Sequence, residues 1–155
     1  MQMSARARMA ELGIELPQVV PPVASYVPAV QTGVYVYTAG QLPMVDGEML
    51  AIGKVGSVVS EELARECARA CALNALAAVV SVVGDIDRIR RVVKVVGFVA
   101  CDPDFVAHPA VVNGASDVLG EIFGEAGVHA RSAVGVAALP KDAPVEVEMI
   151  VEVAP

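Results

Sequence analysis

The chain has 155 residues, a length typical of one domain, and hydrophobic residues make up 55% of it. Its longest apolar run, residues 70–83, includes Asn74 and Ser81 and is shorter than the roughly 18–20 apolar residues that span a membrane. The net charge of −7 argues against a nucleic-acid partner, because such affinity rests mainly on lysine and arginine. We therefore predict a soluble protein, without membrane or nucleic-acid contacts, that buries its apolar excess between subunits.

Cysteine and histidine usage indicates a reducing compartment and no metal. None of the three cysteines lies in a CxxC motif, and their odd number fits the cytoplasm. The two histidines form no HExxH motif, so neither a metal nor a cofactor is expected. One basic cluster could contact RNA, but it lacks the interleaved aromatics that stack on bases and is better explained as a solvated entry to a strand; it consists of Arg88, Arg90, Arg91 and Lys94.

The first part of the chain, residues 1–22, is predicted to form a short helix and an extended Pro-rich segment. The helix is expected over residues 4–12, with Gly13 as its end. Tyr26 precedes the first predicted strand, residues 34–38, which is rich in β-branched and aromatic side chains. Gly40 follows that strand, where it either lets a ligand approach the backbone or simply forms a turn. The Asp46-Gly47 pair predicts a hairpin.

Two long helices are predicted in the middle of the chain. Ser60 is a good N-cap for a helix that runs to residue 83 and ends at Gly84. Residues 54–59 before it are a short strand or an extended loop. A central strand is expected at residues 92–100, which have the continuous valine content of a buried strand. The second helix runs from Pro109 to residue 123, and its internal Asn113-Gly114 pair weakens it, which indicates retention for a site.

The last two predicted strands place charged residues in an apolar context. Residues 145–153 alternate strictly, so that their valines and Met149 face the core while three glutamates face the other way: Glu146, Glu148 and Glu152. The strand before them opens on Arg131, which is either an anchor for a small carboxylate or a structural partner of one of these glutamates.

The order of elements is strand hairpin, helix, strand, helix, strand, strand. This order predicts an α+β fold with one mixed sheet and both long helices packed on one face. The bare face carries the glutamates and is expected to meet solvent or a partner. Nothing in the Pro and Gly pattern marks a boundary, so residues 1–155 are predicted to form one domain.

Three segments resemble a known family, in the right order and from Val23 to Val153. ARSAVGVAALPKDAPVEVE resembles the C-terminal signature of the Rid family, the reactive intermediate deaminases also called YjgF or L-PSP endoribonuclease-like proteins. YTAGQLP and DFVAHPAVVNGA resemble its strand-end motif and its second-helix entry. The resemblance implies a chorismate-mutase-like fold, a homotrimer with a site in each cleft between subunits, and the core strand order 1-4-2-3.

That strand order matters for the site. A simple hairpin of the last two strands would place Arg131 near Glu152, with Glu146 about 20 Å away at ~3.3 Å per residue. Arg131 and Glu146 could then meet only across subunits. The strand order of the family removes this hairpin constraint.

The resemblance also implies roles for individual residues. Arg131 matches the arginine that binds the substrate carboxylate, and Glu146 matches the acid that orients water. The matching cleft residues are Tyr26, Asn113, Gly40 through its backbone, and Ala133, which stands where many members have cysteine. Ala39 replaces a frequent serine, and His129 stands where proline is common. These departures and the extra N-terminal helix indicate a divergent subgroup. Ala39 and Ala133 make the cleft more apolar, which favours substrates with larger apolar tails.

Three functions follow from these features. The family's signature reaction is hydrolysis of an enamine or imine, such as 2-aminoacrylate, to a 2-keto acid and ammonia. This reaction needs no metal, because an imine is already electrophilic. An alternative is a module that binds a small carboxylate or keto acid without catalysis. The net charge and the sparse aromatics weigh against the third, a ribonuclease.

Overall fold

The structure is a computed structural model that describes residues 2–22 and 24–155; Val23, where the resemblance begins, lies outside them. Along the chain it has three α-helices, seven strands and three 3₁₀ turns in the described part. The helices and turns are α1 (Ala5–Leu12), α2 (Glu61–Val83), α3 (His108–Phe123), η1 (Ile86–Arg88), η2 (Gly124–Gly127) and η3 (Pro140–Asp142). The strands are β1 (Ala29–Thr32), β2 (Tyr35–Thr38), β3 (Met44–Val45), β4 (Glu48–Met49), β5 (Ile89–Ala100), β6 (Ala130–Val136) and β7 (Val145–Val153).

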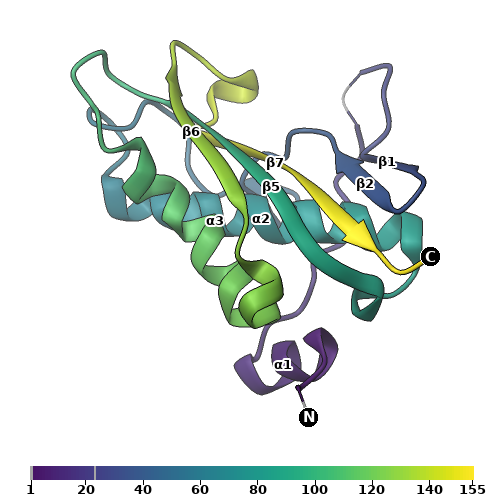
Figure 1. Cartoon of the computed structure of the whole chain (residues 1–155). Coiled ribbons are helices and arrows are strands. Elements are labelled where there is room, and N and C mark those ends of the chain that lie inside the picture. Colours follow the sequence, from purple (N-terminus) through teal and green to yellow (C-terminus); the bar gives the residue numbers. More distant parts are fainter. Residues whose placement is uncertain (1, 23) are drawn as a thin grey trace.

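Five strands form one mixed sheet in the order β1-β2-β7-β5-β6 (Figure 1). Only β5 and β6 run parallel, and the other neighbours are antiparallel. When β2, β5, β6 and β7 are numbered 1 to 4 along the chain, they lie in the sheet in the order 1-4-2-3. This is the core strand order that the resemblance implied. Because β5 lies between β6 and β7, the simple hairpin of the last two strands does not form. The Asp46-Gly47 turn joins β3 to β4, and both of its residues have positive φ, as a tight hairpin requires.

Helix ends follow the capping signals in the sequence. The Ser60 hydroxyl accepts a hydrogen bond from the backbone N–H of Leu63 at 3.2 Å, and Gly84 ends α2 in the left-handed conformation. Ser4 and Gly13 cap α1 in the same way. The strand limits differ more: β5 begins three residues earlier than predicted, and β1 was not predicted as a strand.

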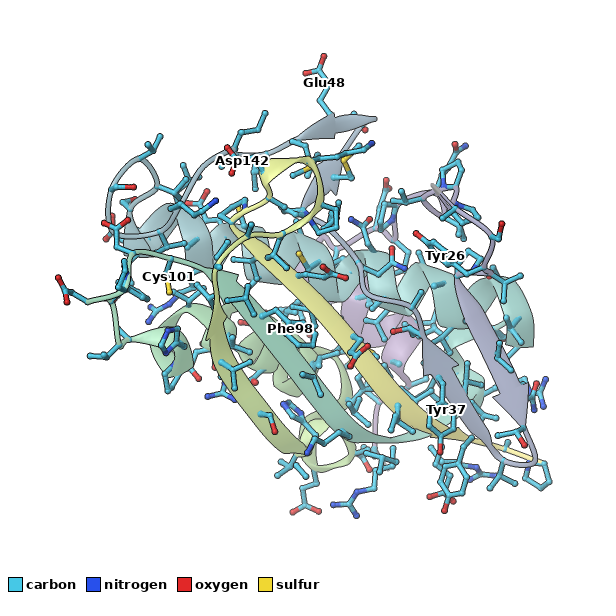
Figure 2. The ribbon with its side chains drawn as sticks, turned by 90° about the horizontal axis from the view of Figure 1, so that it is seen from above. Tyr26, Tyr37, Glu48, Phe98, Cys101 and Asp142 are labelled. Atoms are coloured by element: carbon cyan, nitrogen blue, oxygen red, sulfur yellow. The ribbon has the colours of Figure 1, made fainter. Side chains whose placement is uncertain are left out.

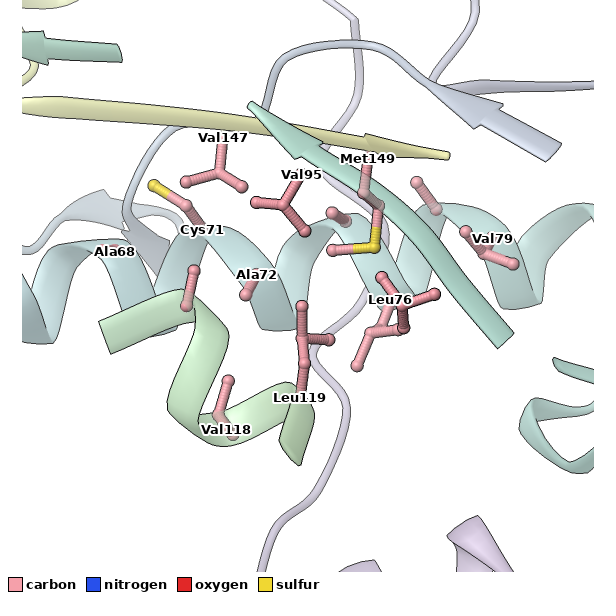
Figure 3. Close-up of a cluster of buried hydrophobic side chains, with 14 of the residues drawn as sticks. Ala68, Cys71, Ala72, Leu76, Val79, Val95, Val118, Leu119, Val147 and Met149 are labelled. Atoms are coloured by element: carbon pink, nitrogen blue, oxygen red, sulfur yellow. The ribbon is translucent and has the colours of Figure 1, made fainter. Parts of the chain in front are cut away.

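The core lies between the sheet and the two long helices, which cover the same face (Figure 1). Leu76 of α2, Leu119 of α3 and Met149 of β7 are fully buried and meet there (Figure 3). The helices themselves approach closely at Gly114, where an added Cβ would overlap the Arg65 carbonyl oxygen. Helix packing is therefore the reason for glycine at this position, which lies beside a predicted site residue.

The N-terminal helix packs against α3 and against η1, the turn that follows α2. Met9 and Ile14 are buried in the same cluster as the α2 residues, and Arg6 pairs with Asp85 at 2.8 Å. By length and composition α2 could cross a membrane, because its most apolar 18-residue stretch has a mean hydropathy of 1.6. However, 61% of that 18-residue stretch is buried inside the fold. The helix is thus apolar on most sides because protein surrounds it, as expected for a core helix.

The opposite face of the sheet is open (Figure 2). Tyr35 and Tyr37 of β2 are 42% and 47% exposed, and Phe98 of β5 lies on the same face. The glutamates of β7 are half-buried. They lie on this open face because the residues that alternate with them along the strand are buried in the core. The open face therefore combines exposed aromatic side chains with carboxylates, as the alternation predicted for the glutamates.

Candidate functional site

Arg131 lies at the second position of β6 and points toward α3. Its register partner on β5, Val95, is buried on the helix-covered side, and side chains paired in this way share a face. The guanidinium Nη1 donates to Asn113 Oδ1 at 2.8 Å and to Ser116 Oγ at 3.1 Å. Nη2 lies 3.4 Å from the Pro109 carbonyl oxygen. Arg131 and Asn113, two of the predicted site residues, are thus brought together.

The charge of Arg131 has only neutral acceptors around it. In the part of the chain that the structure describes, no carboxylate lies within ion-pair distance of this guanidinium. The alternative in which it pairs with a glutamate of β7 is therefore not what this chain forms. A half-buried guanidinium held in place by neutral groups keeps its capacity to bind a ligand carboxylate.

Ser116 and His129 were not predicted as site residues. Ser116 is three residues after Asn113, so both lie on one face of α3. The Ser116 hydroxyl is 2.9 Å from His129 Nε2, and His129 Nδ1 is 2.6 Å from the Gly127 carbonyl oxygen. Because a carbonyl only accepts, Nδ1 carries the proton in neutral His129 and Nε2 accepts from Ser116. The hydroxyl oxygen is then oriented to accept from Arg131, which fixes the guanidinium.

Ala133 continues the same wall of β6. It pairs with Gly97 on β5 and packs against the core, on the same side as Arg131. The thiol of Cys101 lies just past the C-terminal end of β5. Its Sγ is 3.3 Å from His108 Nε2, and both atoms lie against Gly135 of β6. Burial, and then the carboxylate of Asp102, raise the pKa of the Cys101 thiol, so it is protonated at neutral pH.

Tyr26, Gly40 and Glu146 lie together elsewhere in the molecule. Tyr26 and Gly40 line one pocket, and a Cβ added at Gly40 would overlap Glu146 Oε1. Gly40 has no positive φ, so close approach of this carboxylate, rather than turn geometry, is what requires glycine here. The absence of a side chain at residue 40 therefore gives Glu146 its position.

Glu146 is the acid of the predicted site. Burial, and then the nearby carboxylate of Glu148, raise its pKa above the ordinary glutamate value. A raised pKa makes the carboxylate a stronger base once it is ionised. Among the described residues no group of three or more His, Cys, Asp or Glu side chains could hold a metal ion.

The predicted site residues thus form two half-sites within one chain. The anchor half-site is Arg131, Asn113, Ser116 and Ala133, on the helix-covered side of the sheet; the carboxylate half-site is Tyr26, Gly40 and Glu146. The side chain of Glu146 lies on the open side, because Val145 and Val147 on either side of it are buried. The strands of Arg131 and Glu146 are also two spacings apart, about 10 Å, and the two residues are offset by three positions along the strands, about another 10 Å. A single copy does not bring them together.

Comparisons with known proteins agree with the sequence motifs. A family model described as "YjgF/chorismate_mutase-like, putative endoribonuclease" matches residues 6–153. Protein TCP17 of Trypanosoma cruzi is 42% identical over 147 residues, which cover 94% of this chain and 92% of that protein.

Two crystal structures are similar over nearly the whole chain. Protein Atu1372 of Agrobacterium tumefaciens, of unknown function, has a TM-score of 0.88 and 44% identity, over 97% of this chain and 92% of that one. A Shewanella oneidensis MR-1 structure with the same endoribonuclease description has a TM-score of 0.94 and 30% identity, over 97% of this chain and 100% of that one. The chain therefore belongs to the YjgF/chorismate mutase-like family, the Rid family that its motifs indicated.

Proposed function

We propose that the protein hydrolyses reactive enamines and imines of the 2-aminoacrylate type to 2-keto acids and ammonia. In this proposal three copies assemble in the cytoplasm, and the anchor half-site of one copy faces the carboxylate half-site of the next. Each cleft then contains one complete set of the site residues. Family membership and the separation of the half-sites within one copy support this arrangement.

One observation carries the proposal. The Arg131 guanidinium is half-buried and oriented by Asn113 and Ser116, and it has no carboxylate partner among the described residues. Charge-assisted hydrogen bonds to a carboxylate are among the strongest that a protein makes, and a guanidinium can donate two in parallel. A small 2-imino or 2-keto acid supplies such a carboxylate next to its reactive carbon.

The reaction then needs a base near that carbon. The enamine tautomerises to the imine, whose C2 is the electrophile. Glu146 takes a proton from a water molecule as its oxygen bonds to C2, and the imine nitrogen takes up that proton from Glu146, which gives a carbinolamine. Collapse of the carbinolamine forms the 2-keto carbonyl and breaks the C–N bond, while the hydroxyl proton passes through Glu146 to the nitrogen, which leaves as ammonia. Anchoring the substrate by its carboxylate places C2 against the water.

The test is ammonia release from 2-aminoacrylate generated in situ. Arg131→Ala and Arg131→Lys are both expected to lose most of kcat/KM, because lysine does not reproduce the planar fork. Arg90→Ala, which removes an exposed arginine of β5, is the matched control and should behave as wild type. Full activity in Arg131→Lys would contradict the proposed anchor.

A second measurement separates catalysis from binding alone. Glu146→Gln should abolish ammonia release and still bind 2-ketobutyrate in a calorimeter, because the amide keeps the shape of the side chain but is no base. If wild type binds the keto acid and releases no ammonia, the protein is a binding module. Cleavage of RNA that survives Arg131→Ala would instead favour the endoribonuclease description of the family.

A further inference from the structure

A narrow apolar pocket adjoins the carboxylate half-site. Its roof comes from the Pro-rich segment, with Val20, Pro21 and Pro22, and its walls come from Tyr26, Leu42 and Met44. Gly40 also lines it, and Glu146 Oε1 lies against Gly40. The pocket is therefore next to the carboxylate that acts on the substrate in the proposed function.

The pocket is built on fixed elements. Proline locks its own φ, which restricts the backbone of the roof. The loop below is held at Gln41, whose N–H donates to the Val147 carbonyl at 2.8 Å while the Val147 N–H donates back at 3.0 Å. Asn74 of α2 adds two hydrogen bonds of 3.0 Å from its Nδ2, to the carbonyls of Leu42 and Met44. A ligand would enter a pocket that already has its shape.

Size and lining define what fits. The enclosed part of the pocket has a volume of about 40 Å³, which is room for roughly three water molecules at ~10–15 Å³ each. Counted out to its open mouth, the empty volume is about 410 Å³. Lys141, from η3, is the only charged side chain among the described residues that line it. The enclosed part suits an aliphatic chain of about three or four heavy atoms and is smaller than an indole ring.

We propose that this pocket takes the alkyl side chain of the substrate, and that residues 20–22 determine how long that side chain can be. The proposal rests on the proposed function, which places the reacting carbon at Glu146 and the carboxylate at Arg131 of the neighbouring copy. The side chain on that carbon then points past Gly40 into the pocket. The substrates are imines derived from leucine- or methionine-sized amino acids, in preference to alanine- or tryptophan-sized ones.

The experiment compares kcat/KM for imines that an amino-acid oxidase produces from alanine, leucine, methionine and tryptophan. Wild type should prefer the leucine and methionine imines over the alanine imine by roughly tenfold or more, since each fitting methylene contributes about that factor. Val20→Trp fills the roof and should remove this preference while leaving the alanine imine little changed. Gln18→Trp, an exposed position on the same segment, is the control and should keep the preference.

A binding measurement keeps the pocket and the reaction separate. Calorimetry with pyruvate and 4-methyl-2-oxopentanoate tests the same size preference without turnover, in wild type, Val20→Trp and Gln18→Trp. Preference for the longer keto acid, lost in Val20→Trp, supports the pocket even if no imine is hydrolysed, and then only the proposed function fails. Turnover or binding with a size preference that Val20→Trp does not change overturns the pocket and leaves the proposed function standing.

Discussion

At the scale of single residues, the proposed binding of a carboxylate by Arg131 depends on a chain of hydrogen bonds that holds the guanidinium. Ser116 accepts from the guanidinium and donates to His129, which in turn donates to the Gly127 carbonyl. Neither Ser116 nor His129 contacts a substrate carboxylate in the proposed arrangement. Both hold the guanidinium in one orientation, so they are positioning residues, and their effect should appear in binding rather than in the chemical step.

Ser116→Ala tests this chain of hydrogen bonds. The substitution removes an acceptor for Arg131 and leaves His129 Nε2 without its donor, so binding of 2-ketobutyrate should weaken by about 1 kcal/mol, the net value of a typical hydrogen bond. In kinetic terms KM should rise several-fold while kcat changes little. Calorimetry and steady-state rates measure both. Asp117→Ala, the next and exposed residue of α3, is the control, and an equal loss there would show a general effect on α3.

In the proposed reaction, Glu146 sets the pH dependence of activity. Burial and then Glu148 raise its pKa, and the ionised form is the base that the proposed reaction uses. Activity should therefore fall as the pH drops through a value above the ordinary glutamate pKa. Glu148→Gln removes the neighbouring negative charge and lowers the pKa of Glu146, so the acid limb of a kcat/KM profile should move to lower pH. A limb that stays in place would mean that another group controls it.

At the scale of elements, the N-terminal helix stabilises the fold through few contacts. Met9 is the buried residue of α1, and Leu12 on the same helix is 41% exposed. Met9→Ala should lower the free energy of unfolding by about 2 kcal/mol, the lower end of the range for such truncations, because the site lies at the edge of the core. Leu12→Ala should change it far less. Urea unfolding measures both, and equal effects would show that α1 does not pack as described.

Local signals explain which elements the sequence predicts well. Caps at Ser4 and Ser60 and glycines at 13 and 84 act within a few residues, so the helix limits follow from the sequence alone. β1 is four residues long and has one buried side chain, too short a pattern to identify. Strand order depends on pairings between distant residues, and here it came from the family resemblance. The alternation of residues 145–153 assigned Glu146 to the bare face, whereas the face that Arg131 occupies followed only from the register of β6 with β5.

The same limit applies to the site. Arg131, Asn113 and Glu146 were found because motifs mark them. Ser116 was not predicted, although it is three residues after Asn113 and such a spacing places both side chains on one face of a helix. His129 reaches Ser116 only because β6 runs beside α3, which no local pattern indicates.

At the scale of the whole molecule, the opposite placement of the two half-sites makes assembly testable through catalysis. Light scattering should give three times the 16.0 kDa mass of the chain. Arg131→Ala and Glu146→Gln should each be inactive alone. Mixed trimers of the two variants contain clefts in which both half-sites are intact, and random equal mixing makes about a quarter of the clefts complete.

Co-refolding of the two variants therefore should restore up to about a quarter of wild-type ammonia release, since each half-site comes from a different copy. A mixture of either variant with itself is the control and should stay inactive. Mixed trimers, verified by mass, that release no ammonia would contradict a cleft shared between copies.

Because Arg131 and Glu146 lie on opposite faces of one sheet, the proposed activity also depends on protein concentration. Under the proposed assembly, a dissociated copy carries every residue of the site and catalyses nothing, although its fold is intact. Specific activity then falls on dilution below the dissociation constant of the trimer, and it returns on concentration without refolding. A cell that makes few copies would hold a folded but idle pool, so the amount of protein would set the catalytic rate more steeply than in proportion.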